Sequence, residues 1–451
     1  MAEERDVLEH LVLDFMQMRA FAEKPFVIVR GEGIRLYDRE NRSYIDGLSG
    51  VFVASLGYGN RAIVDSVAEQ MLKLHFAPPL HGTNEKAIEL AMALREFAPA
   101  GMSTFKFLSG GSEATEAALK LSRQYHKQTG HPRKFKVISR YGGYHGGTFG
   151  ALSASGGRER KSVFEPLLPG FLHVHPPYCY RCPYGARPED CGTVCARVVD
   201  QTIEAEDPET VAAVIMEPIS ISSAGFVVPP RDFFVQLRES CTRHNVLLIF
   251  DEIITGFGRL GERFGADYYG VMPDVICCGK GMSGGYAPLS AVLIKDEIWS
   301  AFLGRPEDHV EFHHGHTFGG NPVACTAGLA ALKQIVDGHL VERAKEMGAY
   351  LREKVELLAE EFDFVGEVRG AGLLQGFEFA KDRQTRERFP ASVKPGKLVE
   401  AAAMGRGLLA RTGDEFIAFA PPLIVTREDV DEIYRIARES MAEVAPALAR
   451  A

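Results

Sequence analysis

The sequence predicts an α/β fold, in which helices cover both faces of a mainly parallel sheet. Short apolar strands alternate with amphipathic helices through the middle of the 451-residue chain. Those strands are apolar at almost every position, as expected for strands buried on both faces. The two chain ends have other patterns and indicate a smaller α+β domain. We therefore expect an N-terminal segment that joins the small domain (1–59), a large domain (60–328) and a C-terminal small domain (329–451).

The N-terminal part carries two local signals. The first residues, MAEERDVLEHLVL (1–13), place acids where a secretory signal would carry lysine or arginine. We interpret them as an amphipathic helix and expect a cytoplasmic protein. Residues 26–48 show short strands separated by glycine and polar turns, which predicts a small antiparallel sheet.

The middle of the chain supplies the strands of the large sheet. Apolar runs predict strands at 104–108, 135–139, 211–216, 246–250, 275–278 and 290–294. A helix is expected over 231–244, because Phe234, Leu237 and Cys241 are spaced three and four apart on one face.

The C-terminal part combines helices with a few strands. Helices are expected near 324–336, 341–361, 395–404 and 427–445, and strands near 372–379, 408–411 and 416–419. Thr426 and Asp429 have the spacing of a capping box before the last helix.

Composition excludes several classes of protein. Apolar residues make up 46% and charged residues 25%, which is ordinary for a globular chain. The net charge is −9 and no basic run could follow a nucleic-acid backbone, so no nucleic-acid partner is expected. No apolar run approaches the roughly 20 residues of a membrane helix, so no membrane partner is expected either. Eight cysteines are too few for a disulfide scaffold in a chain of this length.

Polar residues follow several of the predicted strands. In open α/β sheets, ligands bind outside the carboxyl ends of the strands. Glu217 follows strand 211–216, Asp251 follows 246–250, and Lys280 comes soon after 275–278. We expect these two acids and one amine to meet at one edge of the sheet.

The turn SGGSEA (109–114) follows strand 104–108 and opens a helix. Gly110 and Gly111 let the backbone approach an anion, Ser112 adds a hydroxyl, and the helix N-terminus favours negative charge. A phosphate would suit this turn, although a tight strand-to-helix turn with a serine cap remains open. The turn fits neither GxxxxGK[ST] nor GxGxxG, so a nucleotide-binding loop is poorly supported here.

Three side chains complete a chemical pattern. A lysine placed after a buried strand loses hydration, so its pKa falls and it can form an imine with an aldehyde. Asp251 could hold the charge of a heterocyclic nitrogen, although an ion pair or a helix cap is the alternative. Tyr144, in YGGYHGG, offers a ring for stacking, although core packing is the alternative. Together with the phosphate turn, Lys280, Asp251 and Tyr144 describe a pyridoxal phosphate site.

The chain also resembles a known family over almost its whole length. It is similar to the class III (omega) aminotransferases, which are fold-type I pyridoxal phosphate enzymes, and among them to amine, taurine and β-alanine:pyruvate transaminases. The resemblance is carried by SGGSEATEAALKLSR, YGGYHGGT, MEPIS, LLIFDEIITGFGRLGERFG, DVICCGKGMSGGYAPLSAVL, HTFGGNPVAC and FAPPLIVT.

The resemblance implies a role for each matching residue. Lys280 would bind the cofactor covalently and transfer the proton, and Asp251 would keep the pyridine nitrogen protonated. The remaining implied contacts to the cofactor are Gly111 and Ser112 at the phosphate, Tyr144 and Ile253 on the two ring faces, His145 and Glu217 as supports, and Thr317 at the phosphate of a neighbouring subunit. The active unit would be a homodimer, which could pair further into a tetramer.

The resemblance also implies substrates. The enzyme would transfer an amino group from an amine or ω-amino acid to pyruvate or a similar 2-oxo acid by a ping-pong mechanism. Arg411 would pair with the keto-acid carboxylate, and its alternative is a surface arginine. Phe52 would line an apolar donor pocket beside Tyr144, and its alternative is core packing. An aminomutase or decarboxylase on the same site is the nearest rival function, and a non-catalytic regulatory protein is a more distant one.

Residues 176–199 depart from the family pattern. Cys179, Cys182, Cys191 and Cys195 have a CxxC and CxxxC spacing that resembles a metal-binding knuckle. We favour reduced or partly paired thiols in a surface loop and predict no metal. His313, His314 and His316 precede Thr317 and are interpreted as part of the loop that shapes the phosphate site.

Overall fold

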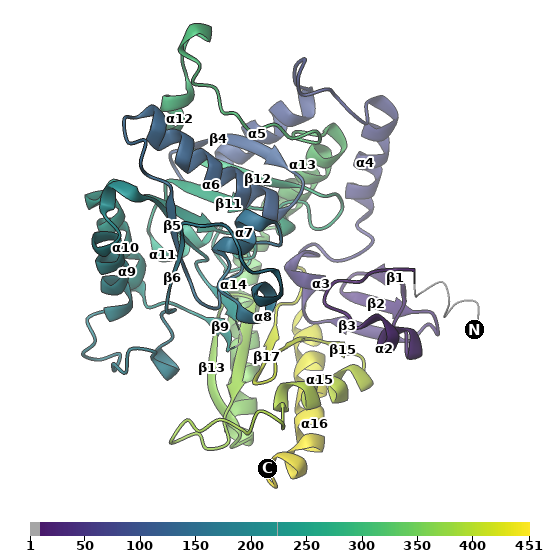
Figure 1. Ribbon diagram of the computed structural model, residues 1–451. Coiled ribbons are helices and arrows are strands. Elements are labelled where there is room, and N and C mark those ends of the chain that lie inside the picture. Colours follow the sequence, from purple (N-terminus) through teal and green to yellow (C-terminus); the bar gives the residue numbers. More distant parts are fainter. Residues whose placement is uncertain (1–9, 223) are drawn as a thin grey trace.

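The computed structural model describes residues 10–222 and 224–451. Within these residues the largest sheet has seven strands in the order β4-β12-β11-β10-β7-β5-β6 (Figure 1). Only β12 runs against the direction of the rest, so the prediction of a mainly parallel sheet is confirmed. The strands are Met102–Leu108 (β4), Lys136–Arg140 (β5), Phe171–Val174 (β6), Val211–Met216 (β7), Leu247–Asp251 (β10), Val275–Cys278 (β11) and Ser290–Lys295 (β12).

Helices cover both faces of this sheet. α6 (Gly111–Gln128) packs on one face, where Ala114, Ala117 and Leu121 are fully buried. α10 (Arg231–Arg243) packs on the other face through Phe234 and Leu237. Side chains at alternate positions of β7, β10 and β11 belong to the two separate core clusters, which explains why these strands are apolar throughout.

The remaining helices support the sheet or build the small domain. The C-terminal helices lie close to the predicted ranges, and the predicted capping box is confirmed, because Thr426 Oγ1 accepts from the Asp429 N–H at 3.2 Å. The helices are Met18–Glu23 (α2), Ser49–Phe52 (α3), Arg61–Lys73 (α4), Glu85–Phe97 (α5), Phe149–Ala154 (α7), Arg158–Lys161 (α8), Val194–Ala205 (α9), Gly265–Tyr269 (α11), Asp296–Trp299 (α12), Pro322–Asp337 (α13), Leu340–Glu361 (α14), Pro395–Gly405 (α15) and Arg427–Leu448 (α16).

Smaller sheets connect the two ends of the chain. One sheet has the order β1-β2-β3-β15, a second β13-β14-β17-β16, and β8 pairs with β9. These strands are Ile28–Glu32 (β1), Arg35–Asp38 (β2), Ser43–Asp46 (β3), Ser220–Ser222 (β8), Gly225–Val227 (β9), Val365–Ala371 (β13), Leu374–Phe379 (β14), Leu408–Leu409 (β15), Arg411–Thr412 (β16) and Phe416–Phe419 (β17). The antiparallel pairing of β1, β2 and β3 confirms the sheet predicted for residues 26–48.

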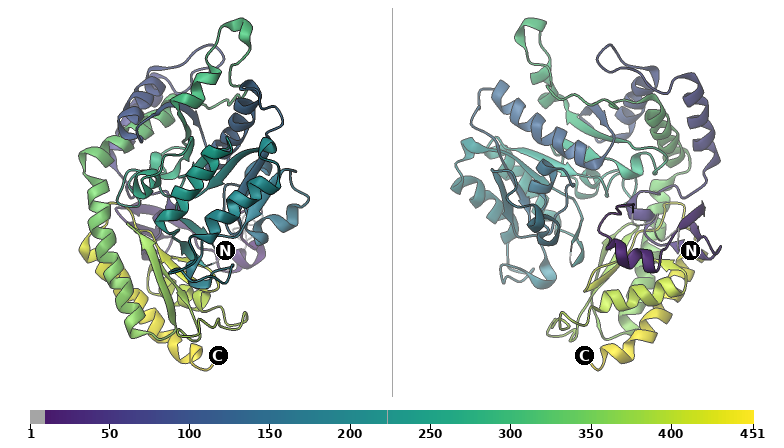
Figure 2. Two further views of the ribbon diagram at one scale, coloured as in Figure 1. Left: turned by 90° about the vertical axis from the view of Figure 1, so that its left-hand side faces the viewer. Right: turned by 45° about the vertical axis from the view of Figure 1, so that its right-hand side comes forward.

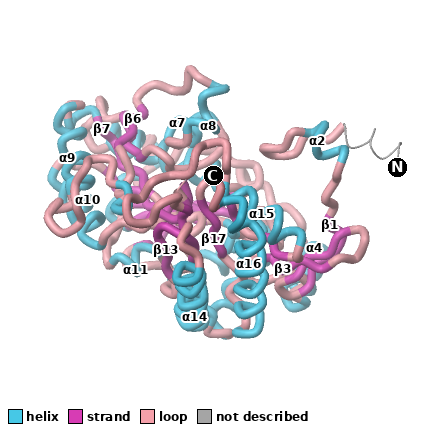
Figure 3. The backbone as a smooth tube through the Cα atoms, turned by 90° about the horizontal axis from the view of Figure 1, so that it is seen from below, coloured by secondary structure: helices cyan, strands magenta, loops and turns pink. Residues whose placement is uncertain are grey.

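The N-terminal strands lie beside the C-terminal elements, because β3 pairs in parallel with β15 (Figure 1). The segment after α13 lies below the large sheet in both views of Figure 2. Seen from below, α14 lies alongside β13 (Figure 3). The division into 1–59, 60–328 and 329–451 stays a prediction, and its limit at 328 falls inside α13.

Two local predictions need correction. A helix was expected over residues 1–13; residues 1–9 lie outside the described residues, and residues 10–13 are not helical. The single strand expected at 408–411 is two short strands, β15 and β16, which belong to different sheets. Local pattern cannot show this switch, because both halves are equally suited to a strand. In the part of the chain that the structure describes, no helix is both long and apolar enough to cross a membrane.

Candidate active site

Four neighbouring parallel strands carry polar side chains at the same edge of the large sheet. Arg140 is the last residue of β5 and Asp251 is the last residue of β10. Glu217 directly follows β7, and Lys280 comes two residues after β11. The strand order β11-β10-β7-β5 brings these residues together, as the positions of the strand ends predict.

Lys280 lies at a sharp change in backbone direction. Its φ of 45° is in the left-handed region, which costs a non-glycine residue on the order of 1–3 kcal/mol. A short 3-10 helix, Lys280–Met282, begins at this residue. Among the described residues, its Nζ has no hydrogen-bond or ion-pair partner, and it lies 5.3 Å from the centre of the Phe52 ring. Burial lowers the pKa of Lys280 to about 8, although the Asp251 carboxylate acts in the opposite direction.

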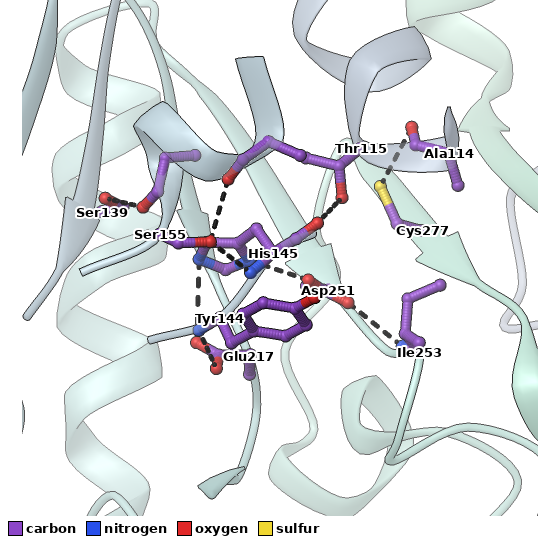
Figure 4. Close-up of polar contacts among 12 residues, drawn as sticks. Ala114, Thr115, Ser139, Tyr144, His145, Ser155, Glu217, Asp251, Ile253 and Cys277 are labelled. Carbon is purple, nitrogen blue, oxygen red and sulfur yellow. Dashed lines mark hydrogen bonds and ion pairs between the residues drawn. The ribbon is translucent and has the colours of Figure 1, made fainter. Parts of the chain in front are cut away.

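Asp251, His145 and Glu217 lie close together (Figure 4), and Arg140 contacts Glu217, so that the four residues form a continuous buried row. His145 Nδ1 lies 2.7 Å from Asp251 Oδ2, and His145 Nε2 lies 3.7 Å from Glu217 Oε2. Arg140 reaches the same Glu217 oxygen, with Nη2 at 3.2 Å. His145 thus fixes one oxygen of the Asp251 carboxylate, and the other oxygen, Oδ1, accepts from the Ile253 N–H at 3.2 Å.

The charged groups in this row shift one another's pKa values. Burial tends to lower the pKa of His145, but the nearby carboxylates of Glu217 and Asp251 outweigh burial and raise it. Burial tends to raise the pKa of Glu217, but the charges of Arg140 and His145 lower it. The row therefore favours a protonated imidazole between two carboxylates.

The glycine-rich turn lies beside this row. α6 begins at Gly111, and Ser112 Oγ accepts from the Gly147 N–H at 3.0 Å. A side chain at Gly146, where φ is +139°, would bring its Cβ to 2.5 Å from Ser112 Oγ. A Cβ at Gly111 would lie 3.2 Å from Ile253 Cδ1. Only glycine fits at Gly146. The N-terminus of α6 favours negative charge, and the Glu113 carboxylate accepts there from the Ser109 and Gly110 N–H groups.

Aromatic side chains border the same space. The Tyr144 N–H donates to Glu217 Oε1 at 3.0 Å, which fixes the backbone that carries the ring. The Tyr144 side chain is 37% exposed, so the ring is accessible. Phe52 is buried and makes an edge contact with Phe226 at 6.4 Å between ring centres. Phe52 therefore packs in the core, which was the alternative interpretation, and its ring also lies next to Lys280.

Two predicted residues lie outside this cluster. Thr317 is exposed in the loop before α13, and it is preceded by His316, whose Nε2 lies 2.9 Å from Ser109 Oγ. Arg411 is half-buried in β16, where burial and then the charge of Arg160 lower its pKa. The charge of Arg160 also lowers the pKa of Lys280, so Arg160 acts on both Arg411 and Lys280.

Sequence reasoning missed three residues. Arg140 follows the strand predicted at 135–139, so the reading applied to the other strand ends would have found it. Ser155, which accepts from the His145 N–H at 2.8 Å, has no such signal. Arg160 lies in a basic run, and its guanidinium carbon is 4.4 Å from the centre of the Tyr144 ring.

The four loop cysteines line one small cavity. All are free thiols, and burial raises the pKa of Cys179 and of Cys195, the latter to about 12. Across the described residues, no three of these sulfur atoms lie within 4.8 Å of one another.

The site fits a phosphorylated aldehyde with a heterocyclic nitrogen. Among the described residues it offers an amine without a partner, a fixed carboxylate, a glycine-rich turn at a helix N-terminus and an accessible ring within one cluster. An amine with a pKa of about 8 can act as nucleophile and base near neutral pH.

Comparison with known proteins gives the same class of enzyme. The class-III aminotransferase family model matches residues 18–440. A diaminobutyrate–2-oxoglutarate transaminase of Halomonas elongata is 36% identical, over 94% of this chain and 92% of that protein. A putrescine–pyruvate aminotransferase of Pseudomonas aeruginosa is 32% identical, over 98% of this chain and 96% of that protein.

The crystal structure of an omega transaminase from Pseudomonas jessenii in complex with PMP superposes with a TM-score of 0.94. It is 33% identical and covers 98% of both chains. The fold and the chemistry of the site define a fold-type I, pyridoxal phosphate-dependent aminotransferase. Within that class, the chain belongs to the class-III aminotransferases, as the resemblance of its motifs predicted.

Proposed function

We propose that this aminotransferase moves an amino group from an amine or ω-amino acid to pyruvate or a similar 2-oxo acid by a ping-pong mechanism. The position of Phe52 carries the proposal. Its ring centre is 5.3 Å from Lys280 Nζ, so the reacting amine has an apolar neighbour on that side. An apolar neighbour favours a donor with an uncharged group on the Phe52 side, because a phenyl ring cannot satisfy a charge there.

The residues at the strand ends would hold the cofactor. Lys280 would bind its aldehyde carbon, and the carboxylate of Asp251, held by His145, would pair with the pyridine nitrogen. Gly111 and Ser112 would bind the phosphate at the start of α6. Tyr144 and Ile253 would lie on the ring faces, and Glu217 would support His145 and the Tyr144 backbone.

The chain contributes proton transfer and substrate orientation. When bound, pyridoxal phosphate supplies an aldehyde that condenses with amines and a ring that withdraws electrons from the reacting carbon. Lys280 Nζ would take a proton from the donor carbon that bears the amino group and deliver it to the former aldehyde carbon, which a pKa of about 8 permits near neutral pH. Arg411 would bind the carboxylate of the 2-oxo acid.

We also propose that the active unit is a homodimer, and that Thr317 of one subunit reaches the phosphate held by the other. Phe318, next to Thr317, is an exposed apolar side chain, and Leu72 and Leu80, on either side of its partner Phe76 in the sequence, are exposed as well. Phe318 makes an edge contact with Phe76 at 6.1 Å between ring centres. An exposed apolar patch of this kind favours a subunit interface. A cytoplasmic location and further pairing into tetramers stay predictions.

A donor panel tests the function. Taurine, β-alanine, 4-aminobutyrate, putrescine and 1-phenylethylamine are each supplied with pyruvate, and alanine is measured. We expect alanine with at least one donor, and none without pyruvate. Release of carbon dioxide or an isomerised amine without alanine would support the rival decarboxylase or aminomutase. No feature of the site favours that rival.

Borohydride reduction of the holoprotein tests the role of Lys280. We expect the cofactor mass on the peptide that contains Lys280, and no such mass in the Lys280→Ala variant. Labelling of a different lysine in the wild-type protein would contradict the assignment.

A further inference from the structure

Arg160 lies at the wall of the site and has no place in the cofactor scheme. It belongs to α8, and its guanidinium carbon is 4.4 Å from the centre of the Tyr144 ring. The same guanidinium is 4.7 Å from the ring centre of Phe15. Arg160 thus lies between Phe15 and Tyr144. The Tyr144 backbone N–H donates a hydrogen bond to the Glu217 carboxylate.

Arg160 and Arg411 both lack an anionic partner. Among residues 10–222 and 224–451, no carboxylate lies within 4.0 Å of either guanidinium, and both side chains are half-buried. A half-buried guanidinium without a counter-charge is unfavourable, so a carboxylate from a ligand would stabilise it. Glu400 acts on Arg411 and Asp251 acts on Lys280 only at longer range.

Arg160 reaches the site through Tyr144. Its guanidinium carbon is 4.4 Å from the centre of the Tyr144 ring, and the Tyr144 N–H donates to Glu217 Oε1 at 3.0 Å. In line with this position, the charge of Arg160 lowers the pKa of Lys280 and of Arg411. A 2-oxo acid such as pyruvate has one carboxylate, next to its reacting carbon, and Arg411 is sufficient for that group. A second guanidinium without a carboxylate partner can bind a second carboxylate.

We propose that Arg160 is a specificity residue, which binds a substrate carboxylate remote from the reacting carbon, while Arg411 binds the carboxylate next to it. This inference rests on the proposed function and names its substrate class. The remote carboxylate comes either from an ω-amino acid donor or from a dicarboxylic 2-oxo acid. Uncharged amines, which have no such group, depend on Arg160 least.

Binding of an unreactive dicarboxylate tests the proposal without catalysis. The dissociation constant of glutarate for the holoenzyme is measured by calorimetry in the wild-type protein and in Arg160→Gln, Arg160→Lys and Arg158→Gln. Loss of a charged hydrogen bond is expected to weaken glutarate binding in Arg160→Gln by about 10- to 100-fold. Arg160→Lys should recover part of the affinity. Arg158 is exposed on the same helix, so Arg158→Gln should bind like the wild type.

Kinetics identify the source of the carboxylate. If ω-amino acids supply it, kcat/KM for β-alanine and 4-aminobutyrate should fall in Arg160→Gln at least about tenfold more than for 1-phenylethylamine. If the acceptor supplies it, the same difference should separate 2-oxoglutarate from pyruvate. Either result supports the proposal. Cofactor content and thermal unfolding of each variant are measured first, so that misfolding is recognised.

Three outcomes overturn the proposal. The first is that the wild-type protein does not bind glutarate. The second is that Arg160→Gln and Arg158→Gln lose the same affinity for glutarate. The third is that Arg160→Gln loses kcat/KM equally for all substrates. Failure of the proposed function has a different signature, because the wild-type enzyme would then form no alanine with any donor, whatever its affinity for glutarate.

Discussion

Lys280 shows how local backbone geometry can prepare a side chain for chemistry. The four residues of β11 are fully buried, and the chain then turns through a left-handed residue that places the amine among few polar neighbours. Desolvation disfavours the charged ammonium, so the pKa falls to about 8. At pH 7 roughly a tenth of the amine is therefore neutral, far more than for a lysine with the ordinary pKa.

This pKa predicts how cofactor uptake depends on pH. Only the neutral amine attacks an aldehyde, so the rate at which apoprotein binds pyridoxal phosphate should rise with pH through a midpoint near 8. The Arg160→Gln variant should have a higher midpoint, because a charge that lowers the pKa of Lys280 is removed. Stopped-flow absorbance between pH 6 and 10 measures both, and a wild-type rate still rising steeply near pH 10 would contradict the pKa.

The pair of Arg140 and Glu217 gives a stability prediction. Glu217→Gln leaves a fully buried guanidinium without its carboxylate, which should lower the free energy of unfolding by about 3–5 kcal/mol. Urea unfolding of the apoprotein measures the change. Glu209→Gln is the control, because Glu209 is paired with His131 at the surface, and little change is expected there.

The same pair predicts a pH dependence. The pKa of Glu217 is lowered in the folded state, so its stabilising effect is present above its unfolded value near 4.5 and is lost as the pH falls through the folded value. The Glu217→Gln variant should lack this part of the acid-induced loss of stability. An unchanged difference between variant and wild type as the pH falls from about 5 to about 2 would contradict the assignment.

At the scale of elements, the strands of the large sheet and the caps of the helices follow from local sequence. All six strands expected between 104 and 294 are present, with ends within about two residues, because buried parallel strands have a continuous apolar pattern. β6 and β13 were missed. β6 has a histidine at its third position, and β13 alternates apolar residues with charged ones and glycine, so neither shows an unbroken apolar run.

The cap of α16 supplies a prediction at this scale. Thr426→Ala removes the acceptor for the Asp429 N–H and should destabilise the protein by about 1 kcal/mol. Thr426→Ser retains the hydroxyl and should recover most of that loss. Chemical unfolding of the three proteins under one condition makes the comparison, and equal stability of Thr426→Ala and wild type would show that the cap is dispensable.

At the scale of the whole molecule, the exposed apolar patch near Thr317 bears on assembly. The loop that carries it is tied to the region before α5, because Asn321 Nδ2 donates to the His75 carbonyl at 3.0 Å. Asn84 Nδ2 likewise donates to the Gly320 carbonyl at 2.8 Å. Leu80 and Phe318 are therefore presented on a fixed surface.

Replacing Leu80 with Asp should weaken the dimer. Leu80 is 93% exposed in the single chain, and a buried charge at a subunit interface is unfavourable. Sedimentation should show a larger monomer fraction for Leu80→Asp, together with faster loss of cofactor on dilution. Leu357→Asp, on the exposed side of α14, is the control and should sediment like the wild type. Identical sedimentation of both variants would remove this patch from the interface.

The sequence by itself determined the class of fold and the chemical types that meet in the site. Apolar periodicity specifies which segments become buried strands, and the residue after each strand is readable without a structure. Lys280, Asp251 and Glu217 could be found in this way because parallel strands bring their carboxyl ends to one edge.

Only the tertiary structure decided which groups act together. The buried contacts of Arg140 with Glu217 and of His145 with Asp251 join residues 77 and 106 positions apart. The approach of Arg160 to Tyr144, and the split of 408–411 between two sheets, likewise depend on long-range packing. Side-chain periodicity records which face of an element is buried, but it carries no information about which distant residue fills the space against that face.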